Sequence, residues 1–197
     1  MSGLGTHSVG RRGFQGGSRL GSGVSMPVSF SPCPMPFRPV KFRPVPLPEP
    51  ARGALWLHAM PGRLEPWPTF LAEAQQVRLS LLVCLTPRHE LVSLSPAYDE
   101  ALRRGTLPMR WQHLPMRDLG LAANVEVFRN GIEQIAQAVT EGDVVLLHCA
   151  AGVGRTGTAA ACLLKRLGLP REQALQRVRS AGSSPESAAQ SGLVDSF

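Results

Sequence analysis

Residues 144–164 read VVLLHCAAGVGRTGTAAACLL, and this stretch determines the predicted fold of the chain. The apolar start predicts a short buried strand, the glycines after it predict a tight loop, and the alanine- and leucine-rich end predicts a helix. Cys149 opens the loop and Arg155 closes it, with five small or apolar residues between them. This spacing lets the loop curl into a cup. Its N–H groups, from Ala150 to Arg155, would face one anion at the helix N-terminus.

The chemistry of this cup would be that of a nucleophile that binds phosphate. Inward-pointing amides, a helix N-terminus and an arginine favour the thiolate of Cys149, which is the reactive form of cysteine. Arg155 offers a planar fork of donors that matches two phosphate oxygens. We expect Thr156 to hydrogen-bond the sulfur and His148 to orient the loop from behind. The sulfur would attack phosphorus and form a phosphocysteine.

Each of these features has an ordinary explanation when it stands alone. A cysteine after an apolar strand is commonly a small buried hydrophobe, and a Gly-x-Gly is commonly a turn. Their combination in one stretch favours the catalytic interpretation. Gly152 and Gly154 suit positions that need a positive φ or a close approach to a ligand. The predicted substrate-binding residues of the loop are Ala150, Ala151, Gly152, Val153 and Gly154.

The composition divides the chain of 197 residues into a basic tail and one domain. The tail, residues 1–50, is rich in Gly, Ser and Pro and is predicted to be disordered, whereas residues 51–197 form the domain. Six basic residues of the tail account for most of the net charge of +7, so this charge says little about the domain. Contact of the tail with nucleic acid or an acidic membrane is a less favoured alternative. The six are Arg11, Arg12, Arg19, Arg38, Lys41 and Arg43.

The cysteines predict neither a metal site nor a disulfide framework. Cys33, Cys84, Cys149 and Cys162 lack metal-ligand spacing, and we expect no metal or organic cofactor. Cys84 and Cys162 lie in apolar segments and are predicted to be buried packing residues. A thiolate nucleophile requires a reducing compartment, so we interpret the protein as cytoplasmic. No apolar run is long enough to span a membrane, and no secretory signal is evident.

The domain alternates strands and helices along its length, which predicts an α/β fold. We expect a central, mostly parallel sheet with helices on both faces. Cys149 would then lie at the carboxyl end of a central strand, where such folds bind ligands. Further strands are expected at Ala54–His58, Leu81–Leu85 and Met109–Leu114, and helices at Pro66–Ser80, Ser95–Gly105, Asn124–Val139, Gly157–Leu167 and Pro170–Ala181.

A second catalytic group is expected because attack on phosphorus expels an alkoxide or phenoxide, which needs a proton. The best candidate is Asp118, in the segment His113-Leu-Pro-Met-Arg-Asp-Leu-Gly120 after a predicted strand. It would protonate the leaving oxygen and then act as a base on the hydrolytic water. An Asp after a strand is otherwise a turn or helix cap. Its position before the Asn124 helix and upstream of Cys149 favours catalysis.

These motifs resemble the cysteine-based protein tyrosine phosphatases. The likeness is to the small dual-specificity branch, most closely the phosphatases associated with cyclin-dependent kinases, and extends over residues 54–197. His148–Gly157 is similar to the signature His-Cys-x5-Arg-Thr/Ser-Gly, and His113-x-Pro-x-x-Asp118-x-Gly also matches. The resemblance implies Cys149 as nucleophile, Asp118 as general acid, and Arg155 with the loop amides as the phosphate site.

The same resemblance implies two further roles. The hydroxyl of Thr156 would help the cysteine leave, and Gln190 is similar in place to a glutamine near the hydrolytic water. For Gln190 the alternative is a surface position on a helix. The tail has no counterpart in the family, and the loop carries none of the basic residues found in the branch that acts on inositol lipids.

We therefore expect hydrolysis of phosphomonoesters on proteins, on phosphotyrosine and also on phosphoserine or phosphothreonine. The expected partner is a phosphorylated protein or peptide. One alternative is the same chemistry on a phosphoinositide or an RNA 5′-phosphate. Another is a catalytically silent module that binds phosphopeptides. The presence of Cys149, Arg155, Thr156 and Asp118 together argues against the silent module.

Overall fold

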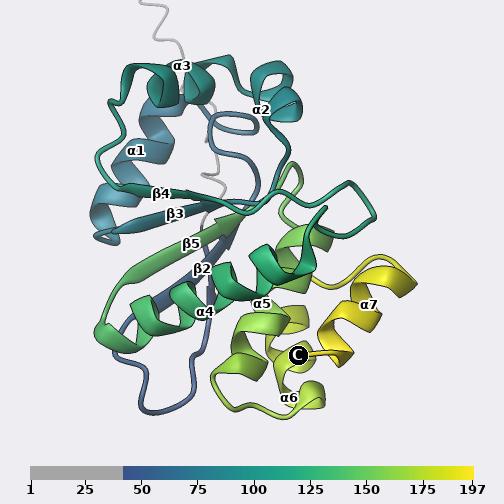
Figure 1. Cartoon of the computed structure of the whole chain (residues 1–197). Coiled ribbons are helices and arrows are strands. Elements are labelled where there is room, and N and C mark those ends of the chain that lie inside the picture. Colours follow the sequence, from purple (N-terminus) through teal and green to yellow (C-terminus); the bar gives the residue numbers. More distant parts are fainter. Residues whose placement is uncertain (1–41) are drawn as a thin grey trace, which may run out of the picture. The chain divides into compact units, whose positions relative to one another are not determined.

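The computed structural model describes residues 42–197, which contain a five-stranded sheet in the order β1-β2-β5-β3-β4 (Figure 1). Pairing among β2, β5, β3 and β4 is parallel, whereas β1 pairs with β2 in the antiparallel direction. β5 lies at the centre of the sheet, as the sequence predicts. The strands are β1 (Arg43–Val45), β2 (Ala54–His58), β3 (Leu81–Cys84), β4 (Arg110–His113) and β5 (Val144–His148).

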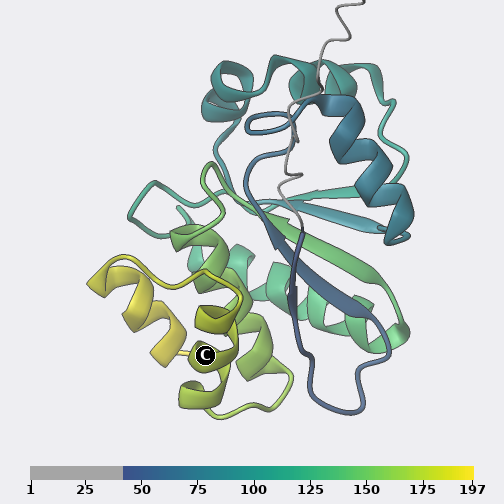
Figure 2. The ribbon, with the colours of Figure 1, turned by 180° about the vertical axis from the view of Figure 1, so that it is seen from behind.

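Helices cover both faces of the sheet. Three helices, α1, α2 and α3, lie on one face, and α4, α5, α6 and α7 lie on the other (Figures 1 and 2). The predicted α/β fold with a mostly parallel sheet between helical layers is therefore confirmed. No helix in residues 42–197 has the length and apolar character to cross a membrane. The bounds are α1 (Trp67–Gln76), α2 (Arg88–Leu94), α3 (Pro96–Arg104), α4 (Val125–Glu141), α5 (Gly154–Arg166), α6 (Arg171–Ser180) and α7 (Ala188–Asp195).

Alternate side chains of the central strands supply two cores, one on each side of the sheet. In β5, Val145 and Leu147 pack with side chains of α4 and α5, whereas Leu146 packs with those of α1 and α3. Burial on both faces explains why β3 and β5 are continuous apolar runs rather than alternating patterns. Packing from both sides fixes the end of β5, which leads directly into Cys149.

The domain begins earlier in the chain than the sequence predicts. Residues 42–50 belong to the predicted tail, yet Arg43–Val45 form β1 against β2. The side chains of Phe42 and Val45 are buried in the cores. The predicted boundary at residue 50 therefore lies too late in the sequence. The prediction of disorder for residues 1–41 concerns residues outside those that the structure describes, as does the prediction for Cys33.

Two helices also differ from the expectation. No pattern in the sequence predicts α2, a short helix that begins after Pro87. The predicted helix from Gly157 begins instead at Gly154, so Arg155 lies in the first turn of α5. Ser95 occupies the N-cap position of α3, but its hydroxyl makes no capping bond there. It donates instead to the Pro61 carbonyl oxygen at 2.7 Å.

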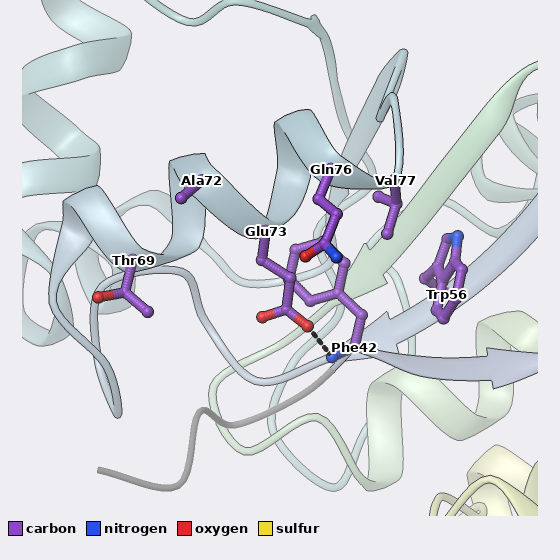
Figure 3. A pocket seen from close by; sticks show the side chains of 7 residues that line it. All are labelled: Phe42, Trp56, Thr69, Ala72, Glu73, Gln76 and Val77. Carbon is purple, nitrogen blue, oxygen red and sulfur yellow. Dashed lines mark hydrogen bonds between the residues drawn. The ribbon is translucent and has the colours of Figure 1, made fainter. Parts of the chain in front are cut away.

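A pocket of about 600 Å³ lies beside α1 at the start of the described chain (Figure 3). Phe42 and Trp56 line it, and Glu73 of α1 accepts a hydrogen bond from the Phe42 backbone N–H at 2.6 Å. The Phe42 ring also packs on His58 and Phe70, with ring centroids 4.9 and 5.6 Å apart. These contacts attach the residue before β1 to the domain. None of the predicted site residues lines this pocket.

Candidate active site

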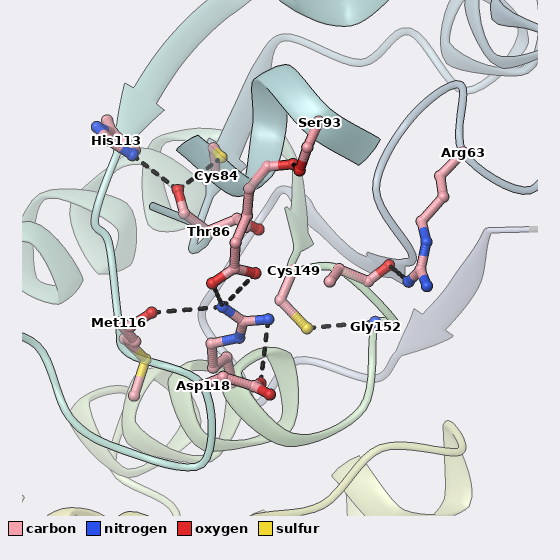
Figure 4. Close-up of polar contacts among 12 residues, drawn as sticks. Arg63, Cys84, Thr86, Ser93, His113, Met116, Asp118, Cys149 and Gly152 are labelled. Atoms are coloured by element: carbon pink, nitrogen blue, oxygen red, sulfur yellow. Dashed lines mark hydrogen bonds and ion pairs between the residues drawn. The ribbon is translucent and has the colours of Figure 1, made fainter. Parts of the chain in front are cut away.

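Cys149 follows the last residue of β5 and opens a loop that leads into α5 (Figure 4). The backbone N–H of Gly152 donates to the Cys149 Sγ at 3.2 Å. Gly152 has a φ of 74°, and a Cβ at this position would collide with the His58 carbonyl group. Only glycine combines this backbone conformation with such a close approach. The loop therefore turns the Gly152 amide toward the sulfur, as the predicted cup requires.

The start of α5 is packed closely against the segment before α7. A Cβ on Gly154 would collide with the Glu186 carboxylate, and a Cβ on Gly157 would lie 2.5 Å from the Ser184 backbone nitrogen. No side chain caps the helix N-terminus. The first N–H groups of an α-helix lack partners within the helix, and they favour an anion there. The two glycines thus bring an uncapped helix end beside Cys149.

Arg155 is 4% exposed, and its guanidinium contacts two carboxylates. Nη1 donates to both carboxylate oxygens of Glu90 at 3.0 Å, and Nη2 lies 3.2 Å from the Asp118 Oδ1. Nη1 also donates to the Met116 carbonyl oxygen at 3.5 Å. A buried guanidinium requires such partners because an uncompensated charge is costly inside a protein. Arg155 therefore joins the loop to α2 and to the segment of Asp118.

Asp118 lies in a tight turn after β4. Met116 forms an isolated bridge with Ala122, and the Gly120 N–H donates to the Arg117 carbonyl oxygen at 3.0 Å. The turn places Leu119 at a φ of 51°, which is uncommon for a residue with a side chain. The Asp118 side chain is 74% exposed. Its carboxylate can therefore meet both Arg155 and a group that enters from solvent.

His148 is fully buried at the end of β5 and is held by a chain of aromatic side chains. The Trp111 Nε1–H donates to the Tyr98 hydroxyl oxygen at 2.7 Å, and that hydroxyl lies 3.1 Å from the His148 Nε2. Burial lowers the pKa of His148 from its ordinary 6.5 to about 3. The imidazole is thus neutral, and its Nε2 is within hydrogen-bond distance of the Tyr98 hydroxyl. His148 positions the strand end from inside the fold, on the side of α3.

Two predicted residues lie in the structure otherwise than expected. The Thr156 hydroxyl is buried without a hydrogen-bond partner among residues 42–197, and the Cys149 sulfur accepts from Gly152 instead. Gln190 is fully buried, so the alternative of a surface helix position is wrong. Its Oε1 accepts from the Glu186 backbone N–H at 2.8 Å. Gln190 therefore supports the segment whose Glu186 carboxylate faces Gly154, and its buried Nε2 has no hydrogen-bond partner among residues 42–197.

The remaining predicted residues form the rim and wall of the loop. Ala151 is exposed, whereas Ala150 and Val153 are partly buried. The Ala150 carbonyl oxygen accepts from the Met60 N–H at 3.2 Å and from the Arg63 Nη1 at 2.7 Å. Figure 4 shows Arg63 reaching the loop from the side opposite Asp118. The loop is thus fixed from outside through its carbonyl groups.

Two acidic residues of the site escape the sequence analysis, Glu90 and Glu186. Glu90 lies in a helix that was not predicted, although its place after a buried parallel strand is one where α/β folds gather functional groups. Glu186 lies in a loop rich in serine, where no pattern marks it. The two cysteines predicted as packing residues, Cys84 and Cys162, are buried as expected, and burial raises the pKa of Cys84 to about 11 and that of Cys162 to about 12.

Comparison with known proteins identifies the family. The model of the Swiss Army Knife protein DSP-PTPase phosphatase domain, PTP-SAK, matches residues 62–192, which include the loop, Arg155 and Asp118. The chain belongs to the PTP-SAK phosphatase family. This assignment confirms the resemblance to cysteine-based phosphatases of the dual-specificity type. The chain has no detectable sequence match among curated proteins.

Solved structures similar to this PTP-SAK domain include phosphatases. A kinase-associated phosphatase, KAP, with serine at its catalytic-site cysteine, matches with a TM-score of 0.70 and 20% identity over 81% of this chain and 94% of that chain. Tk-PTP in its active form matches with a TM-score of 0.55 and 27% identity, over 74% of this chain and 90% of that chain. PTPMT1 in complex with PI(5)P matches with a TM-score of 0.54 and 19% identity, over 73% of this chain and 88% of that chain. The likenesses to KAP and PTPMT1 support the fold alone.

Proposed function

We propose that this PTP-SAK domain hydrolyses phosphomonoesters on proteins through a phosphocysteine at Cys149. The substrates would be phosphotyrosine and also phosphoserine or phosphothreonine. The observation that carries the proposal is that one loop holds both the Cys149 sulfur and the buried Arg155 guanidinium, and that this guanidinium contacts the Asp118 carboxyl group of a distant segment. Because a thiolate persists where thiols stay reduced, the proposal includes a cytoplasmic location.

In the first step, the Cys149 Sγ attacks phosphorus while the bond from phosphorus to the ester oxygen breaks. The amides of the loop and Arg155 hold the equatorial phosphate oxygens, where negative charge collects. Asp118, protonated, gives its proton to the leaving oxygen. The contact of Asp118 with Arg155 supports this role, because a phosphate bound by Arg155 would lie near the carboxyl group. The products are the free alcohol or phenol and the phosphocysteine.

In the second step, Asp118 is a carboxylate and takes a proton from water. The water oxygen then bonds to phosphorus, the bond from sulfur to phosphorus breaks, and inorganic phosphate leaves. The Thr156 hydroxyl, in the first turn of α5, would stabilise the departing thiolate. Among residues 42–197 this hydroxyl has no hydrogen-bond partner, which leaves it available for the role. The backbone N–H of Gly152 donates to the Cys149 sulfur and would stabilise the same thiolate.

A phosphoinositide is the competing substrate class. PTPMT1, which shares the fold, has been solved in complex with PI(5)P. Arg63 at the loop edge also offers a cation that a second phosphate would contact. The loop itself carries no lysine, which favours a protein substrate. The proposal therefore gives precedence to phosphoproteins, and a substrate panel decides between the two.

The nucleophile is tested with Cys149→Ser and an aryl phosphate. We expect this change to abolish turnover, because the serine hydroxyl is a far weaker nucleophile than the thiolate. Cys162→Ala removes another buried thiol and is the matched control, which should retain turnover. Mass spectrometry of rapidly acidified wild-type enzyme should detect one added phosphoryl group. Activity that survives Cys149→Ser would overturn the mechanism.

The general acid is tested by comparing leaving groups in Asp118→Asn. Loss of the general acid lowers turnover about a hundredfold or more when the leaving oxygen is strongly basic, as in phosphoserine. The loss is smaller for a nitrophenyl phosphate, because nitrophenolate leaves without a proton. The ratio of the two losses separates an acid from a residue that only orders Arg155, which would affect both substrates equally.

The substrate class is tested with a panel of phosphotyrosine, phosphoserine and phosphothreonine peptides, phosphoinositides and 5′-phosphorylated RNA. Peptides should be the preferred class. Binding of phosphopeptides without turnover would instead support the silent module.

A further inference from the structure

Arg43 reaches the catalytic loop from the edge strand β1. Its Nη2 donates to the Gly152 carbonyl oxygen, and its Nη1 donates to the carbonyl oxygens of Ala181 at 3.1 Å and Gly182 at 2.6 Å. Three backbone carbonyls from two segments thus meet one guanidinium. The planar fork of arginine suits this arrangement, whereas lysine offers a single point of donation.

The Gly152 carbonyl oxygen has a second donor, the hydroxyl of the buried Ser183, at 2.7 Å. A peptide unit is planar and trans, so its N–H points opposite to its C=O. The N–H of this peptide belongs to Val153. Because the oxygen is held by Arg43 and Ser183, the Val153 N–H is turned away from them. Val153 is the N-cap residue of α5, so this N–H belongs to the helix end that would face phosphate.

Arg43 also stands without a carboxylate partner. No ion pair joins it to Asp or Glu within residues 42–197, although it is partly buried. Burial lowers the pKa of Arg43, and the negative charge of Cys149 acts in the opposite direction. A partly buried guanidinium whose contacts are neutral carbonyl oxygens has no carboxylate to compensate its positive charge. That charge lies behind the loop that is to hold a thiolate and then a phosphate.

We propose that Arg43 is a positioning residue of the phosphatase site, which with Ser183 orients the peptide between Gly152 and Val153 for phosphate binding. This inference rests on the proposed function and adds to it a residue outside the matched range of the family model. Through Arg43, the strand β1 would contribute to catalysis although it lies far from the loop in the sequence. Arg43 itself touches no reacting atom.

The test uses Arg43→Met, Ser183→Ala and the double variant in the full chain. Arg43→Met should lower kcat/KM for an aryl phosphate about ten- to a hundredfold, and weaken the affinity for inorganic phosphate by a similar factor. Ser183→Ala should act in the same direction with a smaller loss. The double variant should lose less than the product of the single losses, because both residues hold the same oxygen.

Arg177→Met is the matched control. Arg177 donates to the Pro46 carbonyl oxygen at 2.8 Å and so also ties α6 to the segment after β1, but it does not contact the loop. We expect the control to keep wild-type phosphate affinity and kcat/KM. Thermal unfolding of all variants shows whether each is folded at the assay temperature. Equal losses of activity in Arg43→Met and Arg177→Met would reduce Arg43 to a structural tie and overturn the inference.

The outcomes separate this inference from the proposed function. If wild-type protein hydrolyses the aryl phosphate and Arg43→Met stays within twofold of it in kcat/KM and phosphate affinity, the role of Arg43 falls while the phosphatase proposal stands. If wild-type protein shows no turnover, the proposed function falls. The affinity for inorganic phosphate then still decides whether Arg43 shapes the anion site.

Discussion

Arg155 is the residue at which the charges of the site meet. Its two carboxylate partners differ in exposure, since the Glu90 side chain is 22% exposed and that of Asp118 is 74% exposed. Ion pairs with an exposed carboxylate contribute little and exchange readily with other ligands. We therefore expect phosphate to replace Asp118 on the Arg155 Nη2, while Glu90 keeps Nη1 in place. One carboxylate is then a structural partner, and the other is released for proton transfer.

Glu90→Gln should reduce both stability and turnover. The change keeps the size of the side chain but leaves the buried Arg155 without the carboxylate on Nη1. Loss of a hydrogen bond between charged groups costs about 1.5–3 kcal/mol, so the free energy of unfolding should fall by about that amount. Turnover should fall about tenfold because the guanidinium is less well held. Urea unfolding and aryl phosphate kinetics measure the two effects.

Inorganic phosphate should stabilise Glu90→Gln more than it stabilises the wild type, because the dianion restores the missing charge. Glu133→Gln is the control, since Glu133 pairs with Arg166 on the surface, where both side chains are about half exposed. That change should alter the free energy of unfolding by less than about 1 kcal/mol. Wild-type stability and turnover in Glu90→Gln would show that Arg155 does not depend on this carboxylate.

At the scale of elements, the close contact between α5 and the segment before α7 sets the position of the helix start. A Cβ on Gly157 would lie 2.5 Å from the Ser184 nitrogen and 2.7 Å from its Cα. These are backbone atoms, so the segment itself would have to move. Gly157→Ala should therefore lower the free energy of unfolding by about 1–3 kcal/mol, the usual cost of overpacking. Urea unfolding measures the change.

Gly192→Ala is the matched control for this prediction. Gly192 also lies inside a helix, α7, but nothing stands within 4 Å of a Cβ built there. Alanine favours a helix interior over glycine by up to about 1 kcal/mol, so this variant should be neutral or stabilised. If Gly157→Ala were stabilised as much as Gly192→Ala, the close packing of α5 on residues 183–186 would not hold.

The elements that the sequence predicts are those whose signals are local. β5, the loop and α5 follow one another in a single stretch, and α4 shows a regular apolar spacing and the N-cap Asn124, whose side chain accepts from two backbone N–H groups. β1 was missed because it has only three residues and contains Pro44, which sheets tolerate at an edge. α2 was missed because a seven-residue helix is too short to show a period.

The same division applies to the residues of the site. Cys149 and Arg155 were predicted from one motif, and Asp118 from its place after a strand. Glu90 stands 65 residues before its partner Arg155, and Arg43 stands 109 residues before Gly152. Such contacts depend on the order of strands in the sheet, which no local pattern specifies. The roles of the predicted residues stay predictions until variants are measured.

At the scale of the whole molecule, the described domain depends on residues that the sequence assigns to the tail. β1 extends the sheet at its edge, Val45 packs in the core on the side of α4, and Phe42 packs in the core on the side of α1. Both side chains are less than 5% exposed. The beginning of the domain therefore closes both cores and also brings Arg43 to the catalytic loop.

Two truncated chains test this dependence. Removal of residues 1–38 leaves a few residues before Phe42, so its N–H remains an amide that donates to Glu73. Because the composition of the tail predicts no core of its own, this chain should unfold with nearly the free energy of the full chain. Removal of residues 1–50 eliminates Phe42 and Val45, and burial of each contributes about 1.5–3 kcal/mol. That chain should be less stable by several kcal/mol.

The two truncations should also differ in activity and in melting temperature. For a domain of this size, each kcal/mol shifts the midpoint by roughly 2–4 °C, so the chain that begins at residue 51 should melt well below the chain that begins at residue 39. Its kcat/KM, measured below both midpoints, should fall as in Arg43→Met, because the loop loses the same guanidinium. Equal midpoints and equal kcat/KM would place the true start of the domain after residue 50 and remove β1 from the account of the site.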